Sequence, residues 1–437
     1  VDLSAELRRP NDIGLVNGLV AVVAASGPAE GSPGRLVILD LEGSVLATAD
    51  LGARGHALDF TNDGRHVVVG CQHSVWLVDL TRFPLGPGSL RRVDFTSYDG
   101  RETMLRALGV YIPEGSTASE SLIPENLTVS PGDRTAWVTL QENNAIAVID
   151  LRRARVSRIF GLGYKWHMLP GNGFDASDMD GEIRIRNWPV RGMYRADGIH
   201  AFKVHGLTYY LVANEGNGHY WQTAGPYPSE TTARVSALKL DPWLLDAFPG
   251  LQEDENLGQL EVLRYPPTGT YVDEAGDTVY RHLYSLGGRS FSVLNSLGWK
   301  VFESGSEFAH VTAERYPDNF NSHWWPVSGT FDWYSDSSGC EPEGVISGEV
   351  DGRTYAFIAL ERMSGIMIYD VTRPWLSRFV DYVNNRNFDT DDYFEAKDIA
   401  PEGMAFIGAD ESPVGEALLV VTNEFTGTTT IYAIVPD

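Results

Sequence analysis

The sequence has very few cysteines, no long hydrophobic run and few basic residues. Only two of its 437 residues are cysteines, which excludes a disulfide-dense scaffold and a metal site built from several thiolates. Cys71 and Cys340 can form at most one disulfide bond, and the sequence leaves open whether they do. No stretch is long and apolar enough to span a membrane, so we expect no membrane insertion. No basic and apolar leader precedes Val1, which indicates a mature, soluble product.

Basic residues are strongly outnumbered by acidic ones. The chain has 34 lysines and arginines against 59 aspartates and glutamates, and its formal net charge is −25. Such a surface repels phosphate backbones and anionic lipid headgroups, so nucleic acid is not an expected partner. The surplus of carboxylates suits divalent cations, although an acidic surface also serves solubility alone. Only the clustering of the carboxylates can separate these two interpretations.

Short segments with strand-forming residues are abundant, and they recur as a repeat. In the three clearest units, a Pro-Glu dipeptide opens a strand and two further strands follow. The paired segments of these units are 135–140 with 145–150, 355–360 with 365–370, and 417–422 with 429–434. Four weaker units have paired segments at 19–24 with 36–41, 66–69 with 75–80, 209–213 with 235–240, and 290–294 with 300–303, the last preceded by 280–286.

The repeat predicts the fold class. Short β-branched and aromatic strands separated by Gly, Asn and Asp turns are typical of four-stranded propeller blades. Seven units therefore predict an all-β fold, a seven-bladed β-propeller. The last unit ends after its third strand, so we expect residues 2–7 to supply its outer strand and close the ring. We predict one domain over residues 1–437, with long insertions between blades at about 99–121, 161–195, 242–277 and 313–339.

Acidic residues recur at two places in a unit, the entry to its first strand and the exit from its second. Because these strands run antiparallel, both places lie at one end of the blade and face one mouth of the channel. These candidates are Glu125, Glu142, Asp197, Glu215, Glu343, Glu361, Glu402 and Glu424. Converging like charges are costly unless cations lie among them, so we expect bound Ca²⁺, or another divalent or transition metal. The alternative is that these side chains only cap backbone amides.

A loop in the second insertion adds three acidic candidates. They are Asp175, Asp178 and Asp180. The loop is similar to a calcium loop, but it is not an EF-hand because Ala176 would occupy the first ligand position. Asp332 and Asp336, just before the unit that contains Glu343, are weaker candidates. The alternative for the loop is a Gly-Asp turn packed over one face of the propeller.

Arg289 occupies the turn between two strands where other units carry a glutamate. A guanidinium group at an acidic, metal-filled mouth would bind a phosphate or a carboxylate well, which makes Arg289 the catalytic candidate. It could equally neutralise neighbouring carboxylates. The chain contains no Gly-x-Ser-x-Gly motif, so serine hydrolysis is not expected.

Several motifs together resemble those of the choice-of-anchor I family, from about residue 122 to the C-terminus. They are Glu125-Asn126-Leu127, Gln141-Glu142-Asn143-Asn144, Pro170-Gly171-Asn172-Gly173, Asn214-Glu215-Gly216, Gly287-Gly288-Arg289-Ser290 and Glu341-Pro342-Glu343-Gly344. That family is similar to the mesenchyme-specific cell-surface glycoprotein domain, and more distantly to phytase-like and alkaline-phosphatase-like propellers. The resemblance implies a secreted protein with an extracellular, periplasmic or cell-surface location.

The resemblance leaves two functions open, since some relatives are called phosphatases or phytase-like esterases and others are linked to biomineralisation or extracellular matrix. The first hypothesis is a metal-dependent phosphoric ester hydrolase, in which the glutamates hold metal ions and Arg289 binds a phosphoester or another anionic small molecule. The alternative is a non-catalytic matrix, adhesion or biomineralisation scaffold. In that case the same ions stiffen the ring, and the insertions bind other extracellular or surface proteins.

Overall fold

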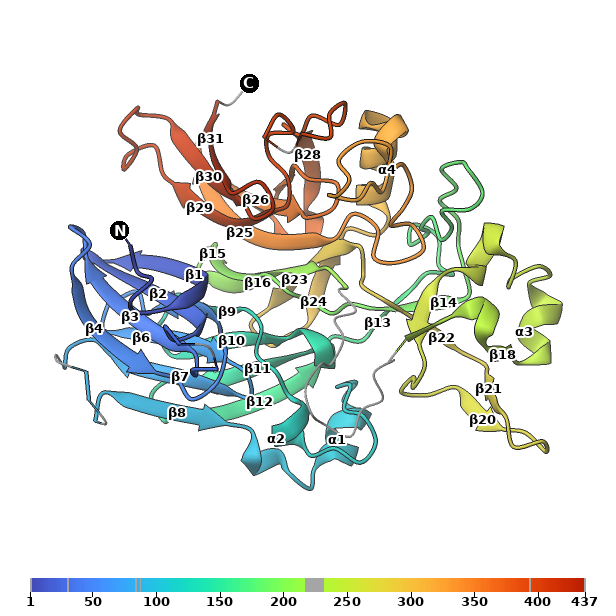
Figure 1. Cartoon of the computed structure of the whole chain (residues 1–437), viewed down its shortest axis with the longest axis horizontal. Helices are drawn as coiled ribbons and strands as arrows, with labels where there is room; N and C mark the ends of the chain where they lie inside the picture. Colours follow the sequence, from blue (N-terminus) through green and yellow to red (C-terminus); the bar gives the residue numbers. More distant parts are fainter. Residues whose placement is uncertain are drawn as a thin grey trace. The chain divides into compact units, whose positions relative to one another are not determined.

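Sheets made of consecutive antiparallel strands dominate the structure, which confirms the predicted all-β fold (Figure 1). The computed structural model describes residues 2–29, 31–82, 85–86, 88–216, 232–392 and 394–435. The chain forms two units. Unit 1 comprises residues 1–162 and 197–210, and unit 2 comprises residues 163–196 and 211–437. The last boundary, between residues 210 and 211, falls inside a strand, β16 (Leu207–Asn214).

The described residues of unit 1 form three four-stranded sheets with their strands in sequence order. The first contains β1 (Arg8–Val16), β2 (Leu19–Ser26), β3 (Arg35–Asp40) and β4 (Val45–Asp50). The second contains β5 (Gly55–Phe60), β6 (His66–Cys71), β7 (Ser74–Asp79) and β8 (Leu90–Asp94). The third contains β9 (Leu127–Val129), β10 (Thr135–Leu140), β11 (Ala145–Asp150) and β12 (Arg155–Gly161). The helices α1 (Glu102–Ala107) and α2 (Ala118–Ser121) lie in the predicted first insertion, and β15 (Ile199–Val204) also belongs to this unit.

Burial explains why these segments form strands. β10 and β11 are buried along almost their whole length, whereas the outer strand β12 alternates between exposed and half-buried positions. A single apolar cluster joins the second and third sheets of unit 1 and includes Leu77, Leu127 and Val138. Continuous apolar residues are therefore typical of the inner strands, and alternating exposed and half-buried residues are typical of the outer strand.

Unit 2 contains two similar sheets and a more irregular region. One sheet has β25 (Pro342–Val350), β26 (Arg353–Leu360), β27 (Ile366–Asp370) and β28 (Arg378–Val383), and the other has β29 (Pro401–Ile407), β30 (Ala417–Asn423) and β31 (Thr428–Ile434). The irregular region includes a five-stranded sheet in the order β13 (Tyr164–Trp166), β14 (Val190–Met193), β22 (Leu283–Leu286), β19 (Glu261–Leu263) and β17 (Thr232–Arg234). It also includes β18 (Lys239–Leu240), β20 (Thr270–Val272), β21 (Thr278–Tyr280), α3 (Pro242–Ala247) and α4 (Glu307–Arg315).

Two predicted repeat units contribute strands to a single sheet. The neighbour of β16 is β23 (Ser290–Asn295), followed by β24 (Lys300–Glu303), and not the expected segment 235–240. Asn214 fixes this pairing, because its buried amide donates to the hydroxyls of Ser290 at 3.1 Å and Ser292 at 3.0 Å. The segment 235–240 instead packs into an apolar cluster with residues of the second and third predicted insertions, such as Trp188 and Leu251. A ring of seven blades therefore stays a prediction.

The N-terminal segment 2–7 is not a strand. It contains a turn, in which the Leu3 carbonyl accepts bonds from the amides of Glu6 and Leu7. The first strand, β1, begins at Arg8 and pairs with β2. The prediction of a strand at residues 2–7 is therefore wrong, and the closure of the ring stays a prediction.

The two cysteines are buried, free thiols. Cys71 ends β6 in unit 1, and Cys340 lies in unit 2 directly before Glu341. Burial raises the pKa of each thiol to about 12. Both residues therefore stay protonated and unreactive at neutral pH.

Candidate metal centre

Three carboxylates meet at one end of a strand pair in unit 2. Glu215 directly follows β16, Glu341 directly precedes β25, and Glu361 directly follows β26. Pro342 lies opposite Leu360 in the antiparallel pair of β25 and β26, so the start of one strand and the end of the other share one edge. One carboxylate oxygen from each of the three glutamates lies within 4.8 Å of the other two. The antiparallel pairing thus places Glu341 and Glu361 at the same edge of this sheet.

The cluster is largely withdrawn from solvent. Glu215 is 1% exposed and Glu341 is 2% exposed. Arg362 is the adjacent cation, because its Nε atom pairs with Oε2 of Glu341 and its Nη1 atom lies 3.0 Å from Oε1 of Glu361. Arg362 therefore pairs with two of the three carboxylates of the cluster.

The pKa of Glu361 reflects its surroundings. Burial and the negative charge of Glu341 raise this pKa well above its ordinary value, whereas Arg362 lowers it. Burial and Glu341 thus favour the protonated form of Glu361. A divalent cation at the same place would favour the ionised form of all three carboxylates.

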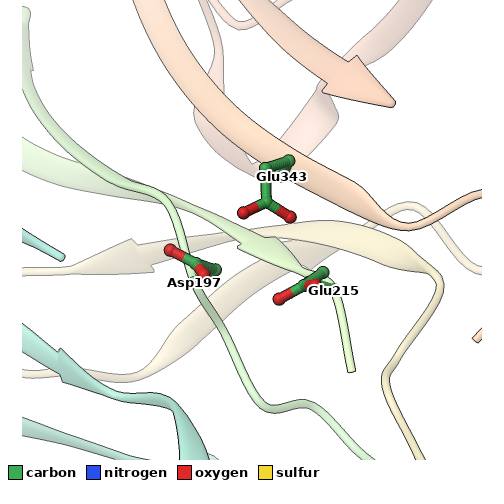
Figure 2. Close-up of side chains that lie close together, drawn as sticks. All are labelled: Asp197, Glu215 and Glu343. Carbon is green, nitrogen blue, oxygen red and sulfur yellow. The ribbon is translucent and has the colours of Figure 1, made fainter. Parts of the chain in front are cut away.

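Glu343 lies beside this cluster. Figure 2 shows Glu343 projecting from β25 and Glu215 at the end of β16, with their carboxylates in the same part of the site. An oxygen of Glu343 lies within 4.8 Å of an oxygen of Glu215. Glu343 can therefore supply a further ligand next to the three that already converge.

Sequence reasoning missed Glu341 and Arg362. Glu341 has a left-handed backbone with φ of 47°, and the register of β25 shifts between Pro342 and Val345. The repeat indicated Glu343 instead, because Glu343 occupies the Pro-Glu position that the clearest repeat units share. Strand alternation would not have linked Glu341 with Glu343, because Glu341 precedes β25 and has a left-handed backbone.

Glu402 and Glu424 are not part of the cluster. Both are exposed, and neither belongs to a group of three potential ligand side chains in the described parts of the chain. Glu424 acts at longer range, because its charge makes a smaller contribution to the raised pKa of Glu361. The last repeat unit thus matches the sequence pattern of the repeat, but its two carboxylates are not part of the cluster.

The remaining predicted carboxylates of the repeat belong to unit 1. Glu125 lies 2.8 Å from Nδ1 of His56, a partner that the sequence did not indicate. Glu142 is buried in the short 3-10 helix between β10 and β11. Asp197 accepts a hydrogen bond of 3.1 Å from Nε2 of Gln141. Their roles as metal ligands stay predictions.

Arg289 joins two segments of unit 2, and its role as a phosphate clamp stays a prediction. Its Nη1 atom donates to the carbonyl of Asp175 at 2.9 Å, and its Nη2 atom donates to the carbonyls of Ser335 at 2.9 Å and Ser337. The ring of Phe174 lies 4.4 Å from the guanidinium carbon. Burial lowers the pKa of Arg289 to about 10, so the group stays charged at neutral pH. Three of its hydrogen bonds thus hold two segments together.

The acidic loop forms a second group with the weaker candidates. The carboxylates of Asp175, Asp178 and Asp180 interact electrostatically with that of Asp332. Asp336 interacts with Asp178. All five belong to unit 2. These carboxylates thus influence one another's charge, but no three of them in the described residues have oxygens within 4.8 Å of one another.

The fold and the site define an all-β protein of sequential antiparallel sheets with a buried cluster of potential oxygen ligands. The chain matches the choice-of-anchor I domain over residues 1–374, and it belongs to this family. Gigasin-3a of Magallana gigas is 30% identical over 196 residues, which cover 42% of this chain and 67% of that protein. No helix in the described residues is long and apolar enough to cross a membrane.

Solved structures with a similar arrangement are distant in sequence. The periplasmic gluconolactonase PpgL of Pseudomonas aeruginosa is 11% identical, with a TM-score of 0.44 over 98% of this chain and 82% of that chain. A protein from Lactobacillus plantarum is 10% identical, with a TM-score of 0.46 over 98% of this chain and 81% of that chain. At such scores these likenesses do not bear on the activity of this chain.

Proposed function

We propose that this protein is an extracellular or cell-surface domain that binds Ca²⁺ through Glu215, Glu341 and Glu361. The observation that carries the proposal is the approach of three carboxylate oxygens to within 4.8 Å in a largely buried site. Oxygens that coordinate one Ca²⁺ at about 2.3–2.6 Å lie at most about 5 Å apart, so the spacing fits a calcium shell. Glu343 and backbone carbonyls would complete the high coordination number that this ion prefers.

The location outside the cytoplasm is part of the proposal. It rests on membership of the choice-of-anchor I family, for which the sequence motifs imply secretion or surface attachment. Calcium is abundant outside cells, so even a site of modest affinity would be filled there.

Hydrolysis of a phosphoester is the second candidate activity. The observation that favours it is Arg362, a permanently charged donor next to the same carboxylates. Arg362 would bind the phosphate, the role first expected of Arg289, and a bound cation would supply Lewis acidity. Without hydrolysis, the domain is a calcium-stiffened scaffold.

Titration calorimetry of chelator-treated protein with CaCl₂ tests the cation site. We expect the Glu361→Gln and Glu341→Gln variants to lose the calcium bound at this site, because each removes one of the converging charges. Glu349→Gln is the matched control, since Glu349 is an exposed glutamate near the far end of β25. Equal heats and stoichiometry for the wild type and both site variants would refute the calcium site.

Turnover of p-nitrophenyl phosphate separates the two activities. An esterase would show metal-dependent turnover that disappears in Glu343→Gln and Arg362→Gln but persists in Glu349→Gln. Calcium binding without turnover in the wild type would favour the scaffold over the esterase.

A further inference from the structure

Five aromatic rings of unit 2 form a continuous group. The ring centroid of Trp324 lies 4.7 Å from that of His323 and 4.4 Å from that of Phe425. Trp325 extends the group beyond Phe425, with centroids 6.1 Å apart, and Trp333 extends it beyond His323, with centroids 6.5 Å apart. All five residues belong to unit 2, and we call them the aromatic patch.

The aromatic patch adjoins the glutamate cluster through Arg362. The guanidinium carbon of Arg362 lies 5.4 Å from the ring centroid of Trp324 and 4.7 Å from that of Tyr334. The same side chain pairs with Glu341 and Glu361. Aromatic rings and carboxylates therefore share one guanidinium neighbour.

Two rings of the patch are open to solvent. Trp325 is 46% exposed and Trp333 is 49% exposed. Tryptophan is highly buried on average in folded proteins, so two half-exposed indoles in one group indicate a surface that binds a ligand.

The loop that carries these rings is tied to the fold by Arg386. This residue is 5% exposed, and its guanidinium donates to the carbonyls of His323 at 2.6 Å and Val327 at 3.1 Å. It also donates to the carbonyl of Arg362 at 2.7 Å. A ligand would therefore meet a preorganised surface and would lose little affinity to the ordering of the loop.

The charges around the patch favour a neutral ligand. An anion would be repelled by the net charge of −25 and by the nearby carboxylates of Glu341 and Glu361. A cation over Trp324 would have to displace Arg362, which already lies over that ring.

The exposed area favours a few sugar rings over a protein. A whole aromatic side chain offers about 150–250 Å², so the two half-exposed tryptophans together offer about 200 Å². A stable protein interface buries about 800 Å² on each partner, which is several times more. A pyranose ring is neutral and has a flat C–H face that can lie on an indole, while its hydroxyl groups point outwards to polar partners or water.

We propose that the aromatic patch binds a neutral polysaccharide, with Trp325 and Trp333 each stacking on a sugar ring. Tyr334 is partly exposed beside Arg362, and its hydroxyl offers a hydrogen-bond partner for the same sugar chain. The two stacking tryptophans are not among the proposed calcium ligands. This binding therefore goes beyond the proposed function and does not rest on it.

Affinity electrophoresis in native gels tests this site with four neutral polysaccharides as probes: hydroxyethylcellulose, xyloglucan, galactomannan and laminarin. We expect at least one of them to retard the wild type. Trp325→Ala and Trp333→Ala should each raise the dissociation constant about tenfold, because each removes one stacking contact. Trp243→Ala is the matched control, since Trp243 is 65% exposed in the first turn of α3 and lies outside the patch.

Trp333→Phe keeps a flat aromatic ring and should retain part of the binding that Trp333→Ala loses. All gels contain the same concentration of CaCl₂, so the comparison of the variants does not depend on whether the glutamate cluster holds calcium. Equal migration of the wild type with and without every one of the four polysaccharides would overturn the inference. Undiminished retardation of folded Trp325→Ala and Trp333→Ala would overturn it as well.

Discussion

Two aspartates of unit 1 act as equivalent links between successive sheets. The amide of Leu58 in β5 donates to Oδ2 of Asp12 in β1 at 2.7 Å, and the amide of Val129 in β9 donates to Oδ2 of Asp59 in β5 at 2.7 Å. In each aspartate, Oδ1 accepts a bond from the following residue's amide. The same side chain thus joins the first strand of one sheet to the first strand of the next.

These links predict how stability depends on pH. Burial raises the pKa of Asp12 and Asp59 to about 6, above the ordinary value of 3.8. The folded state therefore binds more protons between these values, so the stabilisation is fully present below about pH 4 and is lost as the pH rises through about 6. Each residue accounts for at most about 3 kcal/mol, at about 1.4 kcal/mol per pKa unit.

We expect Asp12→Asn and Asp59→Asn to flatten the decline of the urea midpoint between pH 4.5 and pH 7. The amide stays neutral over this range and keeps one acceptor oxygen. Asp410→Asn, at an exposed position, is the control and should leave the slope unchanged. A slope as steep as that of the wild type in both variants would show that these carboxylates do not carry the pH dependence.

At the scale of elements, a glycine controls how closely two sheets of unit 2 pack. A Cβ atom at Gly348 in β25 would lie 2.3 Å from ring carbons of Phe406 in β29. That ring also stacks on Phe357, with centroids 6.0 Å apart, so it has little room to move. We expect Gly348→Ala to destabilise the protein by about 1–3 kcal/mol.

Differential scanning calorimetry of this variant should show a lower melting temperature. Gly132→Ala is the control, because a Cβ atom there has no neighbour within 4 Å. It should be neutral or slightly stabilising. Equal melting temperatures for Gly348→Ala and Gly132→Ala would mean that the sheets separate at little cost.

The elements also show what the sequence determines locally. Strands β10 and β11 match their predicted bounds, because the two strands of this hairpin and the turn between them follow one another in the sequence. The partner of β16 was predicted wrongly, since an insertion separates it from β23 and local periodicity carries no information on distant pairing. The same limit explains the site. Glu215 and Glu361 follow from strand ends, whereas the role of Arg289 depends on carbonyls of two distant loops.

At the scale of the whole molecule, the net charge of −25 offers a rival explanation for any effect of cations. Self-repulsion of a highly charged chain destabilises its folded state, and salt relieves it. We therefore expect NaCl to raise the melting temperature of the chelated protein gradually between about 10 and 300 mM. A stabilising effect of calcium alone would not establish a binding site.

Calcium at low ionic strength separates screening from binding. A specific site stabilises the folded state by about 2.7 kcal/mol when calcium is present at 100 times its dissociation constant, whereas about 1 mM CaCl₂ contributes little screening. We expect this concentration to raise the melting temperature of the wild type and of Glu349→Gln far more than NaCl of equal ionic strength. Glu361→Gln and Glu349→Gln make the same chemical change and alter the overall charge by at most one unit, so screening predicts nearly equal responses from the two variants. A smaller calcium response in Glu361→Gln alone would place the stabilisation at the glutamate cluster, and equal responses would assign it to the overall charge.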